Sequence, residues 1–185
     1  LALGRLVAEA QELKAHGVTG VRITLTRLPD TYDTLEFKVV GTAVSVPGDK
    51  PARQPFTCNL SGQDLAKLLR AGYAPLHLAF GACSIEVDPG CATEFQNQSL
   101  WNSEVGQYSD AMAKIQELAM QRLTEEAAEA HADGLVGVEI SHRVHELPGE
   151  VLLVDLVITA TAVRRFDLPS ESRQSPLVIM KLRDR

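Results

Sequence analysis

Two histidines near the end of a predicted strand, His142 and His145, are the residues of this chain best suited to chemistry, and Glu146 follows them directly. Imidazole, thiolate and carboxylate groups are the usual ligands of zinc-like ions. Residues three apart on a regular strand point to opposite faces, so both histidines reach one ion only if the strand ends or bulges between them. A divalent transition metal is therefore the candidate cofactor, and an ordinary pair of edge histidines is the alternative interpretation.

The three cysteines do not form a recognisable metal motif with these histidines. Cys83 and Cys91 lack the two-residue spacing of a zinc knuckle, and Cys58 lies elsewhere in the chain. An odd number of cysteines in a chain large enough to fold without disulfides is typical of reduced thiols.

A second set of candidates consists of charged side chains that alternate with apolar residues along the predicted strands: Arg22, Glu36, Glu139 and Asp155. A sheet with one polar face is ordinary in a protein that faces water. In a ring of copies, the same residues would line subunit contacts or a central cavity. Arg22 would then meet Glu139 or Asp155 of a neighbouring unit.

The short motifs of common enzyme classes are absent from the sequence. It contains no Gly-x-Ser-x-Gly elbow, no glycine-rich phosphate loop that ends in Lys-Ser or Lys-Thr, and no His-Glu-x-x-His pair. The leading prediction is therefore a non-catalytic binding or scaffold module. The alternatives are a heavy-metal-binding protein that uses His142 and His145, and an enzyme whose site forms at a subunit interface.

Composition indicates a globular protein. Of the 185 residues, 45% are hydrophobic, and the formal net charge is -6. The acidic balance argues against a nucleic-acid partner. No apolar run approaches the roughly 18 residues that span a bilayer, and the N-terminus lacks the pattern of a signal peptide. We therefore expect a cytoplasmic protein without nucleic-acid or membrane partners.

The elements that position these residues occur twice along the chain. Residues 1–23 align with residues 118–140, and Thr42-Ala43-Val44 aligns with Thr161-Ala162-Val163. Such self-similarity predicts a tandem duplication of one structural unit. The identical pairs include Leu1/Leu118, Ala2/Ala119, Arg5/Arg122, Leu6/Leu123, Glu9/Glu126, Ala10/Ala127, Gly17/Gly134, Gly20/Gly137, Val21/Val138 and Ile23/Ile140.

Each copy has the pattern of a helix followed by a β-hairpin. Apolar residues recur at intervals of three and four between Tyr108 and Ala132, which predicts a long amphipathic helix. We expect Gly134, and Gly17 in the first copy, to close the helices in the left-handed conformation. Two runs in which apolar and polar residues alternate lie on either side of Leu147-Pro148-Gly149, and together they predict a hairpin.

Between the copies, Ser61 is expected to cap a helix over Gly62–Arg70, and Tyr73–Val87 is expected to be the opening strand of the second unit. The first copy has no counterpart of this strand, because Leu1 aligns to the interior of the second helix. We therefore expect the natural polypeptide to begin about 45 residues upstream. Two short segments are predicted to be edge strands: Pro55–Leu60 and Pro176–Leu182.

The second copy, YSDAMAKIQELAMQRLTEEAAEAHADGLVGVEISHRVHE followed by VLLVDLVITATAV, resembles the YbjQ family, which carries the description "putative heavy-metal-binding". Tyr73–Val87 looks like the first strand of that family. Gly17–Ile23 with Gly41-Thr42-Ala43-Val44 looks like a second, truncated member. The resemblance implies β-α-β-β units similar to the dodecin subunit, which assemble into closed rings, commonly pentamers. The biochemical function of the family is largely unestablished.

The sequence thus predicts an α+β protein of two dodecin-like β-α-β-β units in tandem, with an antiparallel sheet packed on long helices. The expected boundaries are 1–60 for the first YbjQ-like unit without its first strand, 61–72 for a connecting helix, and 73–185 for the second unit with its C-terminal edge segment. The expected partner is the chain itself, in a homo-oligomer for which a pentameric ring is the first expectation.

Overall fold

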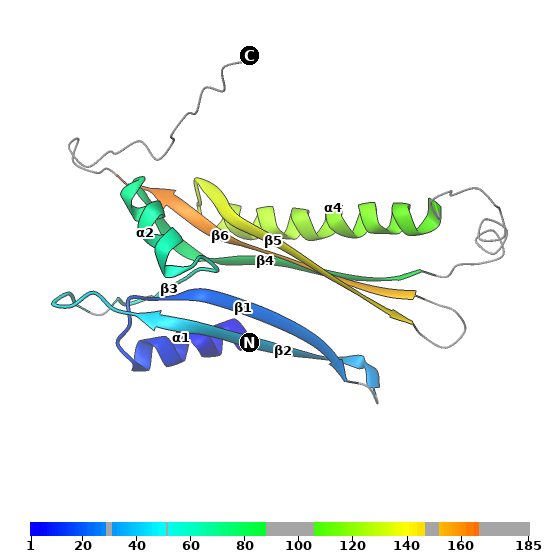
Figure 1. Cartoon of the computed structure of the whole chain (residues 1–185), viewed down its shortest axis with the longest axis horizontal. Coiled ribbons are helices and arrows are strands. Elements are labelled where there is room, and N and C mark those ends of the chain that lie inside the picture. The colour runs from blue at the N-terminus through cyan, green and yellow to red at the C-terminus, as the bar shows by residue number, and fades with distance from the viewer. Residues whose placement is uncertain (29–30, 51, 88–105, 147–151, 167–185) are drawn as a thin grey trace, which may run out of the picture. The chain divides into compact units, whose positions relative to one another are not determined.

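The computed structural model shows an α+β protein with helices and strands in both halves of the sequence (Figure 1). It describes residues 1–28, 31–50, 52–87, 106–146 and 152–166. The elements in chain order are α1 Ala2–Glu12, β1 Gly17–Leu28, β2 Thr31–Val44, β3 Phe56–Thr57, α2 Gly62–Arg70, β4 Tyr73–Val87, α4 Gly106–Glu129, β5 Gly134–Glu146 and β6 Leu152–Arg165.

The strands form two three-stranded sheets with different orders. In the first, β2-β1-β3, the hairpin strands β1 and β2 are antiparallel, and the two residues of β3 pair in parallel with Gly17 and Val18 of β1. In the second, β4-β6-β5, the short connection between β5 and β6 makes them an antiparallel hairpin. The prediction that Pro55–Leu60 contains an edge strand is confirmed; Pro176–Leu182 lies outside the described residues.

The direction of β4 relative to β6 follows from contacts at the two ends of the pair. The Phe166 amide, directly after β6, donates to the Gly72 carbonyl directly before β4. Ser84 near the end of β4 bonds to Asp155 near the start of β6. Rising residue numbers on one strand therefore meet falling numbers on the other, as in an antiparallel pair.

The described contacts divide the chain into two compact units. Unit 1 contains 1–78, 131–136 and 161–185, and unit 2 contains 79–130 and 137–160. Strands β4, β5 and β6 therefore each run from one unit into the other, while α4 lies wholly in unit 2 and runs along one face of the β4-β6-β5 sheet (Figure 1).

Several expected elements are confirmed. The strand predicted over Tyr73–Val87, β4, has the predicted bounds, and so does α2. The Ser61 side chain accepts a hydrogen bond from the Asp64 amide, as a helix N-cap does. The hydrogen bond from Lys67, together with the one from Ser61, holds the pKa of the Asp64 carboxyl below its usual value.

The helix ends correct one expectation. Gly17 and Gly134 do not close helices; each is the first residue of a strand. The left-handed residues that follow the helices are Lys14, with φ 55°, and His131, with φ 52°. They occupy matching positions in the two aligned segments, three residues before the glycines. At Gly17 a small residue is needed because a Cβ atom would overlap the ring of Phe56, whereas at Gly134 the nearest atom to an added Cβ is a Val163 methyl carbon 3.9 Å away.

A second backbone feature recurs at matching positions. Gly20 has φ 63° and Gly137 has φ 64°, a conformation that glycine adopts without strain. At Gly20 the β1–β2 register shifts between Thr19 and Arg22, as at a β-bulge. The repetition of these φ values is what two copies of one unit would produce.

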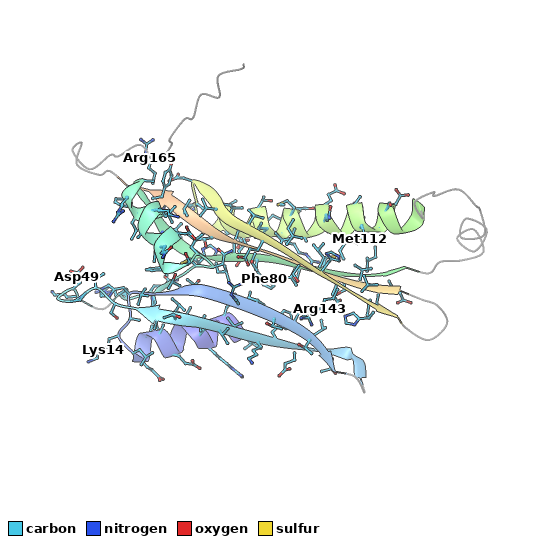
Figure 2. The ribbon with its side chains drawn as sticks, viewed as in Figure 1. Lys14, Asp49, Phe80, Met112, Arg143 and Arg165 are labelled. Carbon is cyan, nitrogen blue, oxygen red and sulfur yellow. The ribbon has the colours of Figure 1, made fainter. Side chains whose placement is uncertain are left out.

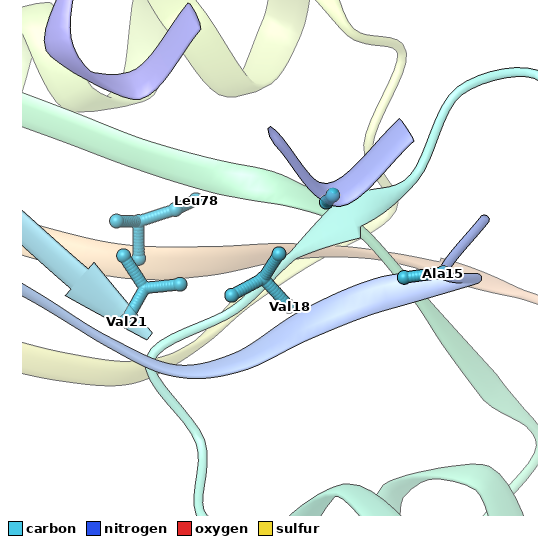
Figure 3. Packing of buried hydrophobic residues seen from close by; sticks show 5 residues of the cluster. Ala15, Val18, Val21 and Leu78 are labelled. Atoms are coloured by element: carbon cyan, nitrogen blue, oxygen red, sulfur yellow. The ribbon is translucent and has the colours of Figure 1, made fainter. Parts of the chain in front are cut away.

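Unit 1 has a small apolar core. Ala10 of α1, Ala15, and Val18 and Val21 of β1 pack together with Leu78 of β4, and each is at most 2% exposed. Val18, Val21 and Leu78 face one another in Figure 3. In unit 2 the buried residues of α4 lie four apart, which defines the helix face turned to the sheet: Ile115, Ala119, Leu123 and Ala127.

Candidate functional site

A polar cluster crosses the three strands of the β4-β6-β5 sheet within unit 2. Asp155 on the central strand β6 is only 3% exposed. The Ser84 hydroxyl on β4 donates to Asp155 Oδ1 over 2.5 Å, and His145 Nε2 on β5 lies 3.1 Å from Asp155 Oδ2. Both oxygens of this buried carboxylate are therefore bonded by side chains from the neighbouring strands, which satisfies a charge that would otherwise be costly to bury.

The order of this cluster decides what it can do chemically. In a nucleophilic triad the histidine lies between the serine and the carboxylate; here Asp155 lies in the middle, so His145 is not placed to take a proton from Ser84. With the proton on Nε2, His145 donates to Asp155 and keeps a lone pair on Nδ1. A histidine held by a carboxylate in this way is the usual arrangement around metal ligands.

The two predicted ligand histidines are not brought together. His142 and His145 both lie inside the continuous strand β5, which runs on to Glu146, so strand alternation points them to opposite faces. His142 is exposed, whereas His145 is half-buried. Within the described ranges, no group of three or more His, Cys, Asp or Glu side chains is arranged to hold a metal ion.

The predicted interface residues divide by exposure. Arg22 on β1, Glu36 on β2 and Glu139 on β5 are exposed in the chain. Asp155 is buried and belongs to the cluster with Ser84 and His145. Two residues that the sequence suggested for different roles, His145 and Asp155, thus form one site.

Sequence reasoning missed Ser84, and one signal could have found it. A serine in a predicted strand is unremarkable alone. However, Asp155 lies among apolar residues in a run that is apolar on its other face, and a carboxylate buried there requires hydrogen-bond donors, for which a serine in a neighbouring strand is a candidate. The position of Ser84 opposite Asp155 depends on the β4–β6 register, which the sequence does not specify.

A second polar cluster, in unit 1, was also missed. Residues 56–60, here called the strap, bond to β1 and to the residue before it: the amides of Phe56 and Cys58 donate to the carbonyls of His16 and Val18. The amides of Gly20 and Val21 donate back to the carbonyls of the strap residues Leu60 and Cys58.

Strap side chains also reach β4 and β6. The Thr161 hydroxyl donates to the side-chain oxygen Oδ1 of Asn59 over 2.6 Å and accepts from the backbone amide of Asn59 over 3.2 Å. The Leu78 amide donates to the Thr57 hydroxyl over 2.9 Å. Cys58 is fully buried in this segment; burial raises the pKa of its thiol, and the hydrogen bond with Thr19 partly opposes that shift.

Helix α4 closes the outer edge of β4. The Phe80 amide donates to Glu126 Oε2 over 2.7 Å, and Arg122 donates to the Ala82 carbonyl. Gly81 lies between these two bonded residues, and a Cβ atom there would collide with the carbonyl group of Ala119. Backbone groups that an edge strand would offer to another chain are thus bonded to helix side chains.

Comparison with known proteins supports the resemblance seen in the sequence. Residues 94–165 match the family model YbjQ_1, described as "Putative heavy-metal-binding". A protein of Mycobacterium tuberculosis (strain H37Rv) named "Encapsulin nanocompartment protein Rv1762c" is 36% identical over 169 residues, which cover 89% of this chain and 64% of that protein. The chain therefore spans less than two thirds of the length of this relative.

The family match coincides with the elements that hold His145 and Asp155. It covers α4 and the β5–β6 hairpin, whereas Ser84 lies before it. None of the described helices is long and apolar enough to cross a membrane. Residues 94–165 of the chain are therefore similar to the YbjQ family.

Proposed function

We propose that this chain is a non-catalytic scaffold or binding module that assembles with copies of itself into a closed ring, with five copies as the first expected number. The observation that carries the proposal is the outer strand β5. Its apolar residues Val138, Ile140 and Val144 are 49%, 55% and 44% exposed. A long edge strand with exposed apolar side chains readily pairs with another chain.

The other edge of the same sheet is unsuited to this role. Glu126 and Arg122 of α4 already bond the amide of Phe80 and the carbonyl of Ala82 on β4. Self-association is therefore directed to β5. Glu139 lies on this strand, as does Arg143, which Figure 2 labels, and we retain Glu139, Arg22 and Glu36 as interface candidates because all three are exposed.

Native mass spectrometry of the purified chain tests this proposal. We expect a single assembly of defined copy number at micromolar concentration. Ile140→Lys should lower the mass by placing a charge on the β5 edge. Met120→Lys is the matched control, because Met120 is an exposed apolar residue on α4, 39% exposed. A wild-type chain that is strictly monomeric would refute the proposal, and an effect of Met120→Lys equal to that of Ile140→Lys would refute the role of β5.

The similarity to the protein named an encapsulin nanocompartment protein supports a further step: the assembly works as part of a protein compartment in the cytoplasm. Electron microscopy of the purified assembly checks this step separately. Closed particles of uniform diameter are expected. Rings that stay isolated at high protein concentration would contradict the compartment role and leave self-association intact.

Heavy-metal binding is the second candidate function, and the contact between His145 and Asp155 favours it. Asp155 fixes the orientation of the His145 ring, which leaves one ring nitrogen available to an ion. Among the residues that the structure describes, one chain provides too few such ligands, and His142 lies on the other face of β5. A complete site would therefore need ligands from another copy.

Metal analysis of protein purified without a histidine tag tests this candidate. Stoichiometric zinc, copper or nickel that is lost on His145→Ala and retained on His77→Ala would support binding at His145. The effect of His142→Ala shows whether the second histidine takes part. Absence of metal after dialysis against each ion in turn would remove this candidate.

A further inference from the structure

The first hairpin is fastened at its open end by His16, the residue directly before β1. The ring nitrogen Nδ1 of His16 accepts a hydrogen bond from the Val46 amide over 3.2 Å, and the His16 amide donates to the Val44 carbonyl. The His16 carbonyl accepts from the amide of Phe56, at the start of the strap. The connection from β2 to the strap is therefore held at both of its ends by one residue.

The second hairpin has the same fastening with a different acceptor. Asp133 and Arg165 align with His16 and Val46, and the Arg165 amide donates to Asp133 Oδ2 over 2.7 Å. The Asp133 amide donates to the Val163 carbonyl, just as the His16 amide donates to the end of β2. The backbone arrangement is thus repeated, while the side-chain acceptor is an imidazole in one copy and a carboxylate in the other.

The two acceptors respond differently to acid. A carboxylate stays an acceptor down to about pH 4, whereas an imidazole ordinarily gains a proton at about pH 6.5 and then has a donor at both nitrogens. Because Nδ1 of His16 accepts from Val46, the proton of the neutral ring is on Nε2. A protonated ring would turn a second N–H donor toward the Val46 amide, so this bond requires the neutral form.

The surroundings of the His16 ring do not favour the protonated form either. Its Nε2 atom is buried and has no hydrogen-bond partner within the part of the chain that the structure describes. No charged side chain in that part of the chain bonds to the ring. The charged residues around this end of the hairpin, on α1, after it and on the connection from β2, are all exposed: Glu9, Glu12, Lys14, Asp49, Lys50 and Arg53.

We propose that His16 is an acid-sensitive latch of the first hairpin. The neutral ring holds the connection from β2 to the strap closed, and protonation below about pH 6 releases this connection at Val46. Asp133 keeps the aligned position of the second hairpin closed over the same pH range. Acid therefore loosens one hairpin selectively, at the end from which the strap departs. The latch does not depend on self-association, because it lies within one chain.

Hydrogen exchange of the full chain at pH 7.5 and pH 5.5, read at single amides by mass spectrometry with electron-transfer fragmentation, tests the latch. Exchange times are scaled for the intrinsic effect of pH on amide exchange, so that the remaining change reports opening. Protection of the Val46 amide should fall about tenfold at pH 5.5, because its hydrogen bond is lost. Protection of the Arg165 amide should not change.

Exchanging the two acceptors provides the matched variants. His16→Asp should abolish the change at Val46, because a carboxylate accepts at both pH values, and His16→Asn should do the same without adding a charge. Asp133→His should transfer the acid-induced loss of protection to the Arg165 amide.

Three results would overturn the proposal. The first is equal protection of the Val46 amide at both pH values in the wild-type chain. The second is an equal loss at Arg165, which would show general loosening by acid. The third is a loss at Val46 that persists in both His16→Asp and His16→Asn, which would assign the titration to another group.

Discussion

The β1–β2 hairpin and the β5–β6 hairpin share a sequence pattern, yet each is completed on the opposite side. The first gains its third strand next to β1, and the second gains its third strand next to β6. In alignment, β1 corresponds to β5 and β2 to β6. The strand that is central in one hairpin is therefore the outer strand in the other.

The burial of the aligned strands depends on their neighbouring strands and not on the sequence pattern that they share. From Val154 to Ile158, central strand β6 is buried on both faces, whereas its counterpart β2 is largely exposed. Val18 and Val21 of β1 are each 2% exposed, whereas Val138 of β5, which aligns with Val21, is 49% exposed. One sequence pattern can thus serve as core or as an edge, and the added strand decides which.

The largest effect is expected at Gly81, on strand β4, which pairs with β6 of the second hairpin. Gly81→Ala places a methyl group against the Ala119 carbonyl group, and helix backbone cannot move aside cheaply. We expect a loss of about 3 kcal/mol in the free energy of unfolding, measured by urea denaturation at fixed protein concentration. Gly4→Ala is the control, because an added methyl group there meets nothing within 4 Å. Equal stability of the two variants would show that α4 does not lie tightly on β4.

The aligned acids Asp155 and Glu36 offer the next comparison. Asp155→Asn removes the charge from a buried group bonded to Ser84 and His145, and we expect it to cost about 2 kcal/mol. Glu36→Gln, at an exposed position, should change the stability by less than about 0.5 kcal/mol. The measurement is again urea denaturation. Similar costs at both positions would mean that the two hairpins are in equivalent surroundings.

The aligned glycines Gly17 and Gly134 sharpen the comparison further. A Cβ atom at Gly17 would overlap the ring of Phe56 in the strap, whereas at Gly134 the nearest atom is a Val163 methyl carbon 3.9 Å away. Gly17→Ala should therefore cost about 1–2 kcal/mol, and Gly134→Ala should be neutral. Thermal unfolding of both variants checks this, and a Gly134→Ala variant as unstable as Gly17→Ala would indicate that a segment also covers the start of β5.

The smallest effect is expected at Cys58. Because burial raises the pKa of this thiol, the protonated form is favoured in the fold; the associated stability is present below the ordinary thiol pKa and is lost as the pH rises through the raised value. Ellman's reagent at pH 8, with mass spectrometry to locate the product, should label the half-buried Cys83 before Cys58. Labelling of Cys58 at the same rate without denaturant would contradict burial of the strap.

The sequence was sufficient to predict the helices and strands whose signals lie within the element itself. Amphipathic periodicity predicted α4, the Ser61 cap predicted the start of α2, and alternation predicted β4 with its observed bounds. Gly17 and Gly134 were misassigned because a glycine just after a helix is ambiguous: it fits a helix end as well as a strand start that needs close packing.

The site was only partly predictable for a different physical reason. His145 and Asp155 were recognised as candidates, but their contact with Ser84 depends on the register of three strands that are distant in sequence. The same limit applies to the bond between Asn59 and Thr161, because the residue pattern within either segment does not indicate which distant segment it contacts. The features that could not be predicted from the sequence are therefore those that depend on pairing between distant strands and not on local propensity.

The strap also has a consequence for synthesis on the ribosome. Asn59 bonds to Thr161, which lies 102 residues later in the chain. The strap therefore emerges from the ribosome long before Thr161 is synthesised, and folding by contacts this distant in sequence is slow. Nascent chains that end before β6 should leave the Asn59 groups that bond Thr161 open to water or to chaperones, so that this half of the protein matures only after β6 has been synthesised.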